Sequence, residues 1–77
     1  MENSTYKTKD LGEAAALLVK KQKLVRMDRE GRTCWFIFAE NTLCLELSGN
    51  YFFGELPANL RDYYEALNIL KNRIFST

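Results

Sequence analysis

The chain has 77 residues, of which 47% are apolar and 13% aromatic, and its formal net charge is +1. This length leaves room for one small domain, and the composition provides enough apolar residues for a single core. No apolar run approaches the roughly 18 residues of a membrane-spanning helix, and the polar residues 1–10 are not typical of a signal peptide. We therefore expect a cytoplasmic protein that does not associate with membranes.

The N-terminal region divides into two parts. Residues 1–9 show no periodicity, so we expect a flexible N-terminal segment followed by a single globular domain over residues 10–77. A helix is predicted to begin at Asp10, because Glu13 completes the spacing of a capping box. Its three consecutive alanines, Ala14–Ala16, would let a neighbouring helix or sheet approach closely.

A β-hairpin is predicted next. Residues 24–28 and 32–39 are rich in β-branched and aromatic side chains, and they flank a three-residue loop that ends in Gly31. Gly31 would take the left-handed position that such a loop requires. This pairing would place Val25 opposite Trp35.

The second strand of this hairpin is apolar on both sides. Its side chains alternate between two sets: Cys34, Phe36 and Phe38 on one side, Trp35 and Ile37 on the other. A hairpin with one solvated face should alternate between apolar and polar residues instead. Either helices cover both faces, or one face contacts another chain, and a shift of one residue would exchange the two sets.

Residues 41–53 fit two structures. Alternating leucines favour a strand, whereas the spacing of Leu43, Leu47 and Tyr51 favours a helix. We predict the helix, capped by Asn41 or Thr42 and ending at Gly54, and keep a third strand as the alternative.

The last helix is predicted over Asn59–Phe75, with Asn59 as its N-cap. Arg61 and Glu65 are four residues apart and can pair on its solvent side. Its apolar stripe comprises Leu60, Tyr63, Tyr64, Leu67, Leu70 and Ile74.

These elements predict a small α+β domain in the order α-β-β-α-α, with the hairpin packed against the helices. The expected core draws on every element. It includes Leu11, Ala15, Leu18, Val25, either Trp35 or Phe36, Phe38, Leu47, Leu60, Tyr64, Leu67 and Leu70.

Groups with catalytic or metal-binding chemistry are sparse. The chain has no histidine, the commonest general base and metal ligand at neutral pH. Cys34 and Cys44 are ten residues apart and make a poor zinc site, so free thiols in a reducing compartment are expected. The four glycines are too scattered for a phosphate-binding loop. We predict no enzymatic activity, no cofactor, no metal and no small-molecule substrate.

The charges are unevenly distributed along the chain. Six cations fall within thirteen residues: Lys20, Lys21, Lys23, Arg26, Arg29 and Arg32. Such a stretch could contact the phosphates of DNA or RNA, although the nearly neutral total charge argues against this role. An ordinary solvated surface is the alternative.

The aromatic residues favour a protein interface. Five side chains provide more apolar surface than so small a core needs: Trp35, Ile37, Tyr51, Phe52 and Phe53. The sequence therefore predicts a non-catalytic binding module for a protein partner or for a second copy in a homodimer. Nucleic-acid binding through the cationic stretch is the alternative function.

Four segments, taken in order, resemble a known family. They are Tyr6–Leu11 leading into the alanine-rich helix, Phe36–Phe38, Tyr51–Leu56, and Tyr64–Phe75 of the last helix. The family comprises short proteins of unknown function from bacteria, their phages and other mobile elements. The resemblance covers nearly the whole chain from Tyr6 onward and implies a cytoplasmic context. It brings no assigned activity and no functional residues.

Overall fold

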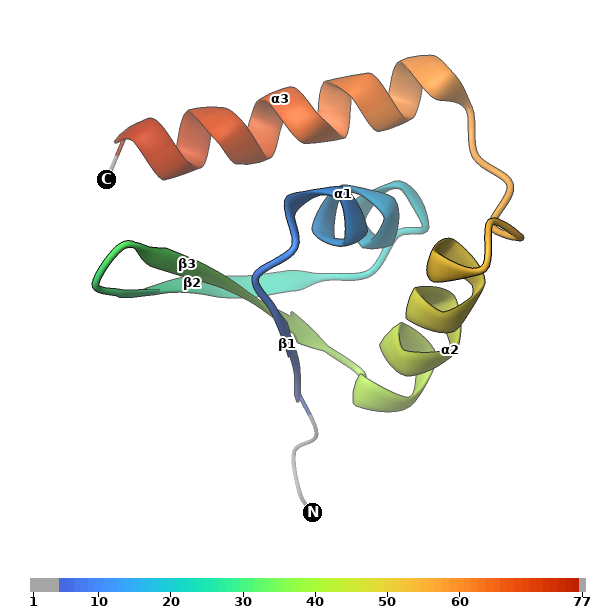
Figure 1. Ribbon diagram of the computed structural model, residues 1–77, viewed down its shortest axis with the longest axis horizontal. Helices are drawn as coiled ribbons and strands as arrows, with labels where there is room; N and C mark the ends of the chain where they lie inside the picture. The colour runs from blue at the N-terminus through green and yellow to red at the C-terminus, as the bar shows by residue number, and fades with distance from the viewer. Residues whose placement is uncertain (1–4, 77) are drawn as a thin grey trace.

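The computed structural model describes residues 5–76 as three helices and a three-stranded sheet (Figure 1). The elements are β1 (Thr5–Thr8), α1 (Leu11–Val19), β2 (Leu24–Glu30), β3 (Thr33–Ala39), α2 (Asn41–Phe52) and α3 (Leu60–Ser76). The predicted α+β class is confirmed. The order differs by one element, because a strand precedes α1.

The additional strand pairs with the second strand of the hairpin. The sheet order is β1-β3-β2, both pairings are antiparallel, and β1 aligns from Thr5 opposite Ala39 to Thr8 opposite Phe36. The sequence predicts a flexible segment here, because the alternation over four mostly polar residues is too short to distinguish a strand from a loop. The partner strand supplies the backbone hydrogen bonds. The rest of the expected flexible segment, residues 1–4, lies outside the described residues.

The hairpin itself is present, but its turn and register differ from the prediction. Glu30 pairs with Thr33, so the loop has two residues, with Gly31 at φ 61°. A bulge at Val25 interrupts the pairing, and Asp28 rather than Val25 lies opposite Trp35. The bulge places Val25 at the surface, where it is 46% exposed.

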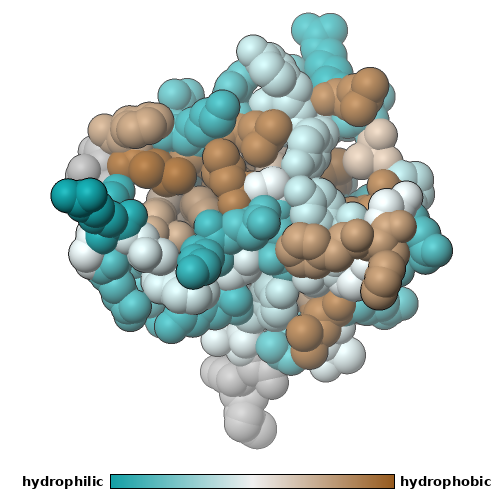
Figure 2. Space-filling view, in the orientation of Figure 1, coloured by the Kyte–Doolittle hydropathy of each residue, from teal (hydrophilic) through white to brown (hydrophobic). Residues whose placement is uncertain are grey.

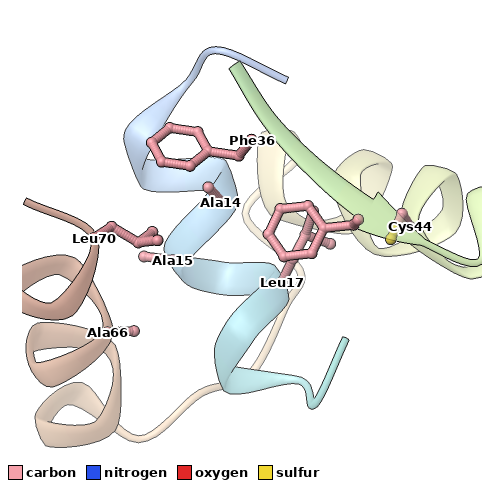
Figure 3. Packing of buried hydrophobic residues seen from close by; sticks show 8 residues of the cluster. Ala14, Ala15, Leu17, Phe36, Cys44, Ala66 and Leu70 are labelled. Atoms are coloured by element: carbon pink, nitrogen blue, oxygen red, sulfur yellow. The ribbon is translucent and has the colours of Figure 1, made fainter. Parts of the chain in front are cut away.

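Helix α1 is the centre of the molecule. Figure 1 shows it between the sheet and α3, with α2 beside one end of the sheet on the same side. Ala14, Ala15 and Ala16 are all buried, as close approach from more than one direction requires. In Figure 3, Phe36 of β3 reaches α1 at Ala14, and Leu70 of α3 reaches it at Ala15.

Of the four helix ends for which the sequence predicts a capping or terminating residue, three are confirmed. The Asp10 carboxylate accepts a hydrogen bond from the Glu13 backbone N–H at 2.8 Å, and the Asn59 side chain caps α3 in the same way. Gly54, at φ 73°, follows the end of α2 as expected. The predicted cap at Asn41 or Thr42 is wrong, because α2 begins after Glu40 without a side-chain cap.

Helix α3 contacts the core over a narrower surface than its apolar stripe predicts. Ala66 and Leu70 are buried, but Leu60 is 84% exposed and Tyr64 is 64% exposed, so assigning these two to the core was wrong. The neighbour of Tyr64, Tyr63, reaches Gly12 of α1, so α1 meets the side of α3 that carries Tyr63 and Leu70 rather than the whole apolar stripe. Among the described residues, no helix combines the length and apolar character needed to cross a membrane.

Candidate binding surfaces

The most buried charged group is structural. Glu13 is 3% exposed, and its two carboxylate oxygens accept hydrogen bonds from the Tyr6 hydroxyl and, at 2.6 Å, from the Thr8 hydroxyl. Ser48 of α2 lies 3.2 Å from the same Tyr6 oxygen. These contacts join β1, α1 and α2, and they give each carboxylate oxygen the hydrogen-bond partner that a buried polar group requires.

A second polar contact joins α2 and α3 to the start of α1. The Tyr63 hydroxyl donates to the Gly12 backbone oxygen at 3.2 Å, and the Tyr51 hydroxyl hydrogen-bonds to Tyr63. That hydrogen bond, together with burial, raises the pKa of Tyr51 to about 12. Tyr51 was a candidate interface residue, but the structure places it half-buried in this contact.

The cysteines differ in exposure. Cys44 is fully buried, and burial followed by the nearby charges of Glu13 and Glu40 raises the pKa of its thiol. A buried thiol with a raised pKa is a poor nucleophile. Cys34 is half-buried beside the core. Within residues 5–76, no group of three His, Cys, Asp or Glu side chains could hold a metal ion.

The six candidate nucleic-acid residues do not form one patch. Lys20, Lys21 and Lys23 lie at the start of β2 and Arg32 at its far end, a separation of roughly 20 Å along a seven-residue strand. Two of the six have specific contacts. Arg26 pairs with Asp28 at 3.0 Å, and the Arg29 guanidinium donates to the backbone oxygen of Ile74 at 2.8 Å.

Trp35 and Ile37 lie on the face of the sheet opposite the helices, which we call the open face. Their alternation with Phe36 and Phe38 places them there, since Phe36 and Phe38 pack against α1. Ile37 is nonetheless only 2% exposed. Lys7 and Lys9 hold their ammonium groups over the Trp35 ring, with Nζ 4.8 Å and 5.8 Å from its centroid.

Phe52 and Phe53 lie at the end of α2 and are 60% and 82% exposed. Together with Leu60 and Tyr64 at the start of α3 they form what we call the corner patch. The Phe52 ring is edge-on to the Tyr51 ring at 5.0 Å between centroids, so one member of the patch is held by a half-buried neighbour. Figure 2 shows hydrophobic side chains gathered over α2 and along α3 on this side of the molecule.

A shallow groove of about 440 Å³ separates the end of α1 from α3. Its charged lining consists of Lys21, Asp62, Glu65 and Arg73, two cations and two anions. With no net charge and no clustered acids, this groove offers little to select a charged ligand.

Sequence analysis missed four surface residues that the structure makes prominent. Leu60 and Tyr64 were placed in the core because their spacing matches the helix stripe. Lys7 and Lys9 were passed over within a segment expected to be flexible. Their alternation with Tyr6 and Thr8 was the available signal.

Comparisons of the chain with protein-family models, with curated proteins and with solved structures give no match. The resemblance described from the sequence therefore stays a prediction.

Proposed function

We propose that the chain is a small non-catalytic binding module that associates with a second copy of itself through the corner patch. The observation that carries this proposal is the exposure of four large apolar side chains around one connection. Phe52, Phe53, Leu60 and Tyr64 are each 60% exposed or more. They are four of the nine exposed large hydrophobic residues in the described chain, and they lie at the two ends of the connection between α2 and α3.

The composition of the patch favours a protein partner. Aromatic side chains are enriched at the centres of protein interfaces, and monomeric proteins rarely leave large contiguous apolar patches exposed. The formal net charge of +1 leaves two copies with almost no mutual repulsion. A twofold pair would place each corner patch against the other copy's patch.

The state of the polar groups supports a non-catalytic role. Two buried side chains could in principle act in catalysis. Glu13 accepts hydrogen bonds from two hydroxyl groups, and burial raises the pKa of the Cys44 thiol, which makes it a poor nucleophile. A cytoplasmic bacterial or phage context is proposed on the family resemblance alone.

Light scattering across a concentration series tests the proposal. We expect the wild-type mass to rise toward that of a dimer, and Phe53→Ser combined with Tyr64→Ser to return it to the monomer. Both positions are exposed, so each substitution should change the free energy of unfolding by less than about 0.5 kcal/mol.

Leu45→Ser is the matched control, because Leu45 is a 55% exposed apolar residue of α2 outside the corner patch. It should leave the association unchanged. A wild-type protein that stays monomeric at the highest concentration would contradict the proposal. So would a Leu45→Ser variant that associates as weakly as the patch variant.

A further inference from the structure

The open face of the sheet is organised in rows across the three strands. Lys7 and Arg26 flank Ile37 in one row, from β1 and β2 respectively. In the next row Trp35 lies opposite Asp28, and Lys9 follows β1 on the other side of the ring. The face therefore has a central apolar column on β3 with cations along β1.

Among residues 5–76, the anions on this face lie on β2: Asp28, which is already paired with Arg26, and Glu30. Two further anions border the face, Glu40 past the end of β3 and Asp10 directly after Lys9. On the β1 side, the side chains that share the face are Thr5, Lys7 and Lys9. An anionic chain running along β1 and β3 would thus meet cations first.

The contacts of Lys7 and Lys9 with the Trp35 ring can be replaced by a ligand that stacks on the ring. Lys7 and Lys9 are both exposed residues, and within residues 5–76 the contact described for their ammonium groups is the Trp35 ring. Trp35 is half-buried, and a cation over a ring that is partly in contact with water is a weaker contact than a nucleobase stacked on it. Displacing the lysines would free them for the phosphates on either side of the base.

We propose that the open face binds single-stranded nucleic acid, with one base stacked on Trp35 and the flanking phosphates contacted by Lys7 and Lys9. This goes beyond the proposed self-association and uses a different surface. It also differs from the cationic stretch considered in the sequence, of which only Arg26 belongs to this site. Stacking and phosphate contact are both independent of base identity, so the binding should tolerate many sequences.

Trp35 is the single tryptophan of the chain, so its fluorescence reports the site directly. The experiment titrates the protein with single-stranded DNA and RNA oligonucleotides of about ten nucleotides, a length within the range that such sites cover. We expect quenching that weakens with salt. Two phosphate contacts predict an affinity about sevenfold lower after a fourfold rise in salt, since the slope for single strands is about −0.7 per contact.

Two charge-matched double variants separate this site from general electrostatics. Lys7→Gln with Lys9→Gln should weaken the quenching and remove most of its salt dependence. Lys20→Gln with Lys21→Gln removes the same charge at the end of α1, and it should leave both unchanged. Circular dichroism of each variant establishes that it is folded, and light scattering in the same samples separates oligonucleotide binding from self-association.

Further arms test the stacking step. Inorganic polyphosphate and duplex DNA carry the same charges without an accessible base, and both should quench far less than either single strand. Binding of DNA, RNA or both supports the proposal and identifies the ligand. No quenching at low salt, equal quenching by polyphosphate or duplex, or equal loss in the two double variants would overturn it.

Discussion

The two faces of β3 carry apolar side chains of similar size but exclude water by different means. Phe36 and Phe38 lie beneath α1 and are 1% and 0% exposed. Ile37, on the open face, is 2% exposed although no helix covers it, and its cross-strand neighbours are Lys7 and Arg26. Long charged side chains can cover apolar surface with their aliphatic stems while the charge stays in water.

This difference shows that a doubly apolar strand does not require helices on both sides. The helix-covered face is a packed interior, in which each side chain has fixed neighbours. On the open face, Ile37 is flanked by the long and exposed side chains of Lys7 and Arg26 instead. The two faces therefore bury their apolar side chains to the same degree but with different kinds of neighbour.

The largest expected effect comes from cavities made on each face. Phe36→Ala should lower the free energy of unfolding by about 3 to 5 kcal/mol, because the packed interior cannot collapse around the void. Ile37→Ala should cost only about 2 kcal/mol, since the side chains of Lys7 and Arg26 can close over it. Urea denaturation followed by circular dichroism measures both. Equal costs would show that the open face is as rigid as the covered one.

Gly12 and Gly49 make the next comparison. A methyl group on Gly12 would collide with the Tyr51 hydroxyl, whereas Gly49 in α2 faces open space. Gly12→Ala should destabilise by about 1 to 3 kcal/mol, and Gly49→Ala should stabilise by about 0.5 to 1 kcal/mol. A neutral Gly12→Ala variant, measured in the same urea experiment, would mean that α2 and α1 can shift apart easily.

The hydrogen bond between Tyr51 of α2 and Tyr63 of α3 predicts that the stability of the fold depends on pH. Since the pKa of Tyr51 is raised to about 12, its contribution to stability is complete below the unfolded pKa of about 10 and is lost as pH rises through 12. The urea midpoint of the wild type should therefore fall more steeply between pH 10 and 12 than that of Tyr51→Phe. Parallel curves for the two proteins would rule out this contribution.

The smallest expected effect tests how the open face is closed. Lys7→Met keeps an unbranched stem beside Ile37 and should change the free energy of unfolding by less than about 0.5 kcal/mol. Lys7→Ser removes the stem and should cost about 1 kcal/mol through exposure of apolar area. If the two variants cost the same, the charge of Lys7 rather than its stem protects Ile37.

The sequence predicts the helices well because their ends are encoded locally. Asp10, Asn59 and Gly54 mark boundaries through their own side chains or backbone freedom, and each lies where the pattern places it. The exposure of Leu60 and Tyr64 could not be predicted in this way. It depends on which side of α3 meets α1, and periodicity within one helix carries no information about its partner.

The candidate site on the open face was hidden for a related reason. Trp35 was identified, but Lys7 and Lys9 reach it only because β1 pairs with β3 in one particular register. A four-residue strand depends on its partner for that register, and nothing within it specifies the pairing. Half of the corner patch, Phe52 and Phe53, is predicted from the sequence, because consecutive aromatic residues provide more apolar surface than so small a core needs.

The bulge at Val25 also bears on how the protein avoids polymerising. β2 forms an edge of the sheet, and an exposed edge is a template on which another chain can extend the ladder into a fibre. The bulge breaks the regular row of backbone groups along that edge, and the charges of Arg26, Asp28 and Glu30 follow it. A chain with an exposed apolar corner can therefore associate through side chains while this edge of its sheet resists the addition of a strand.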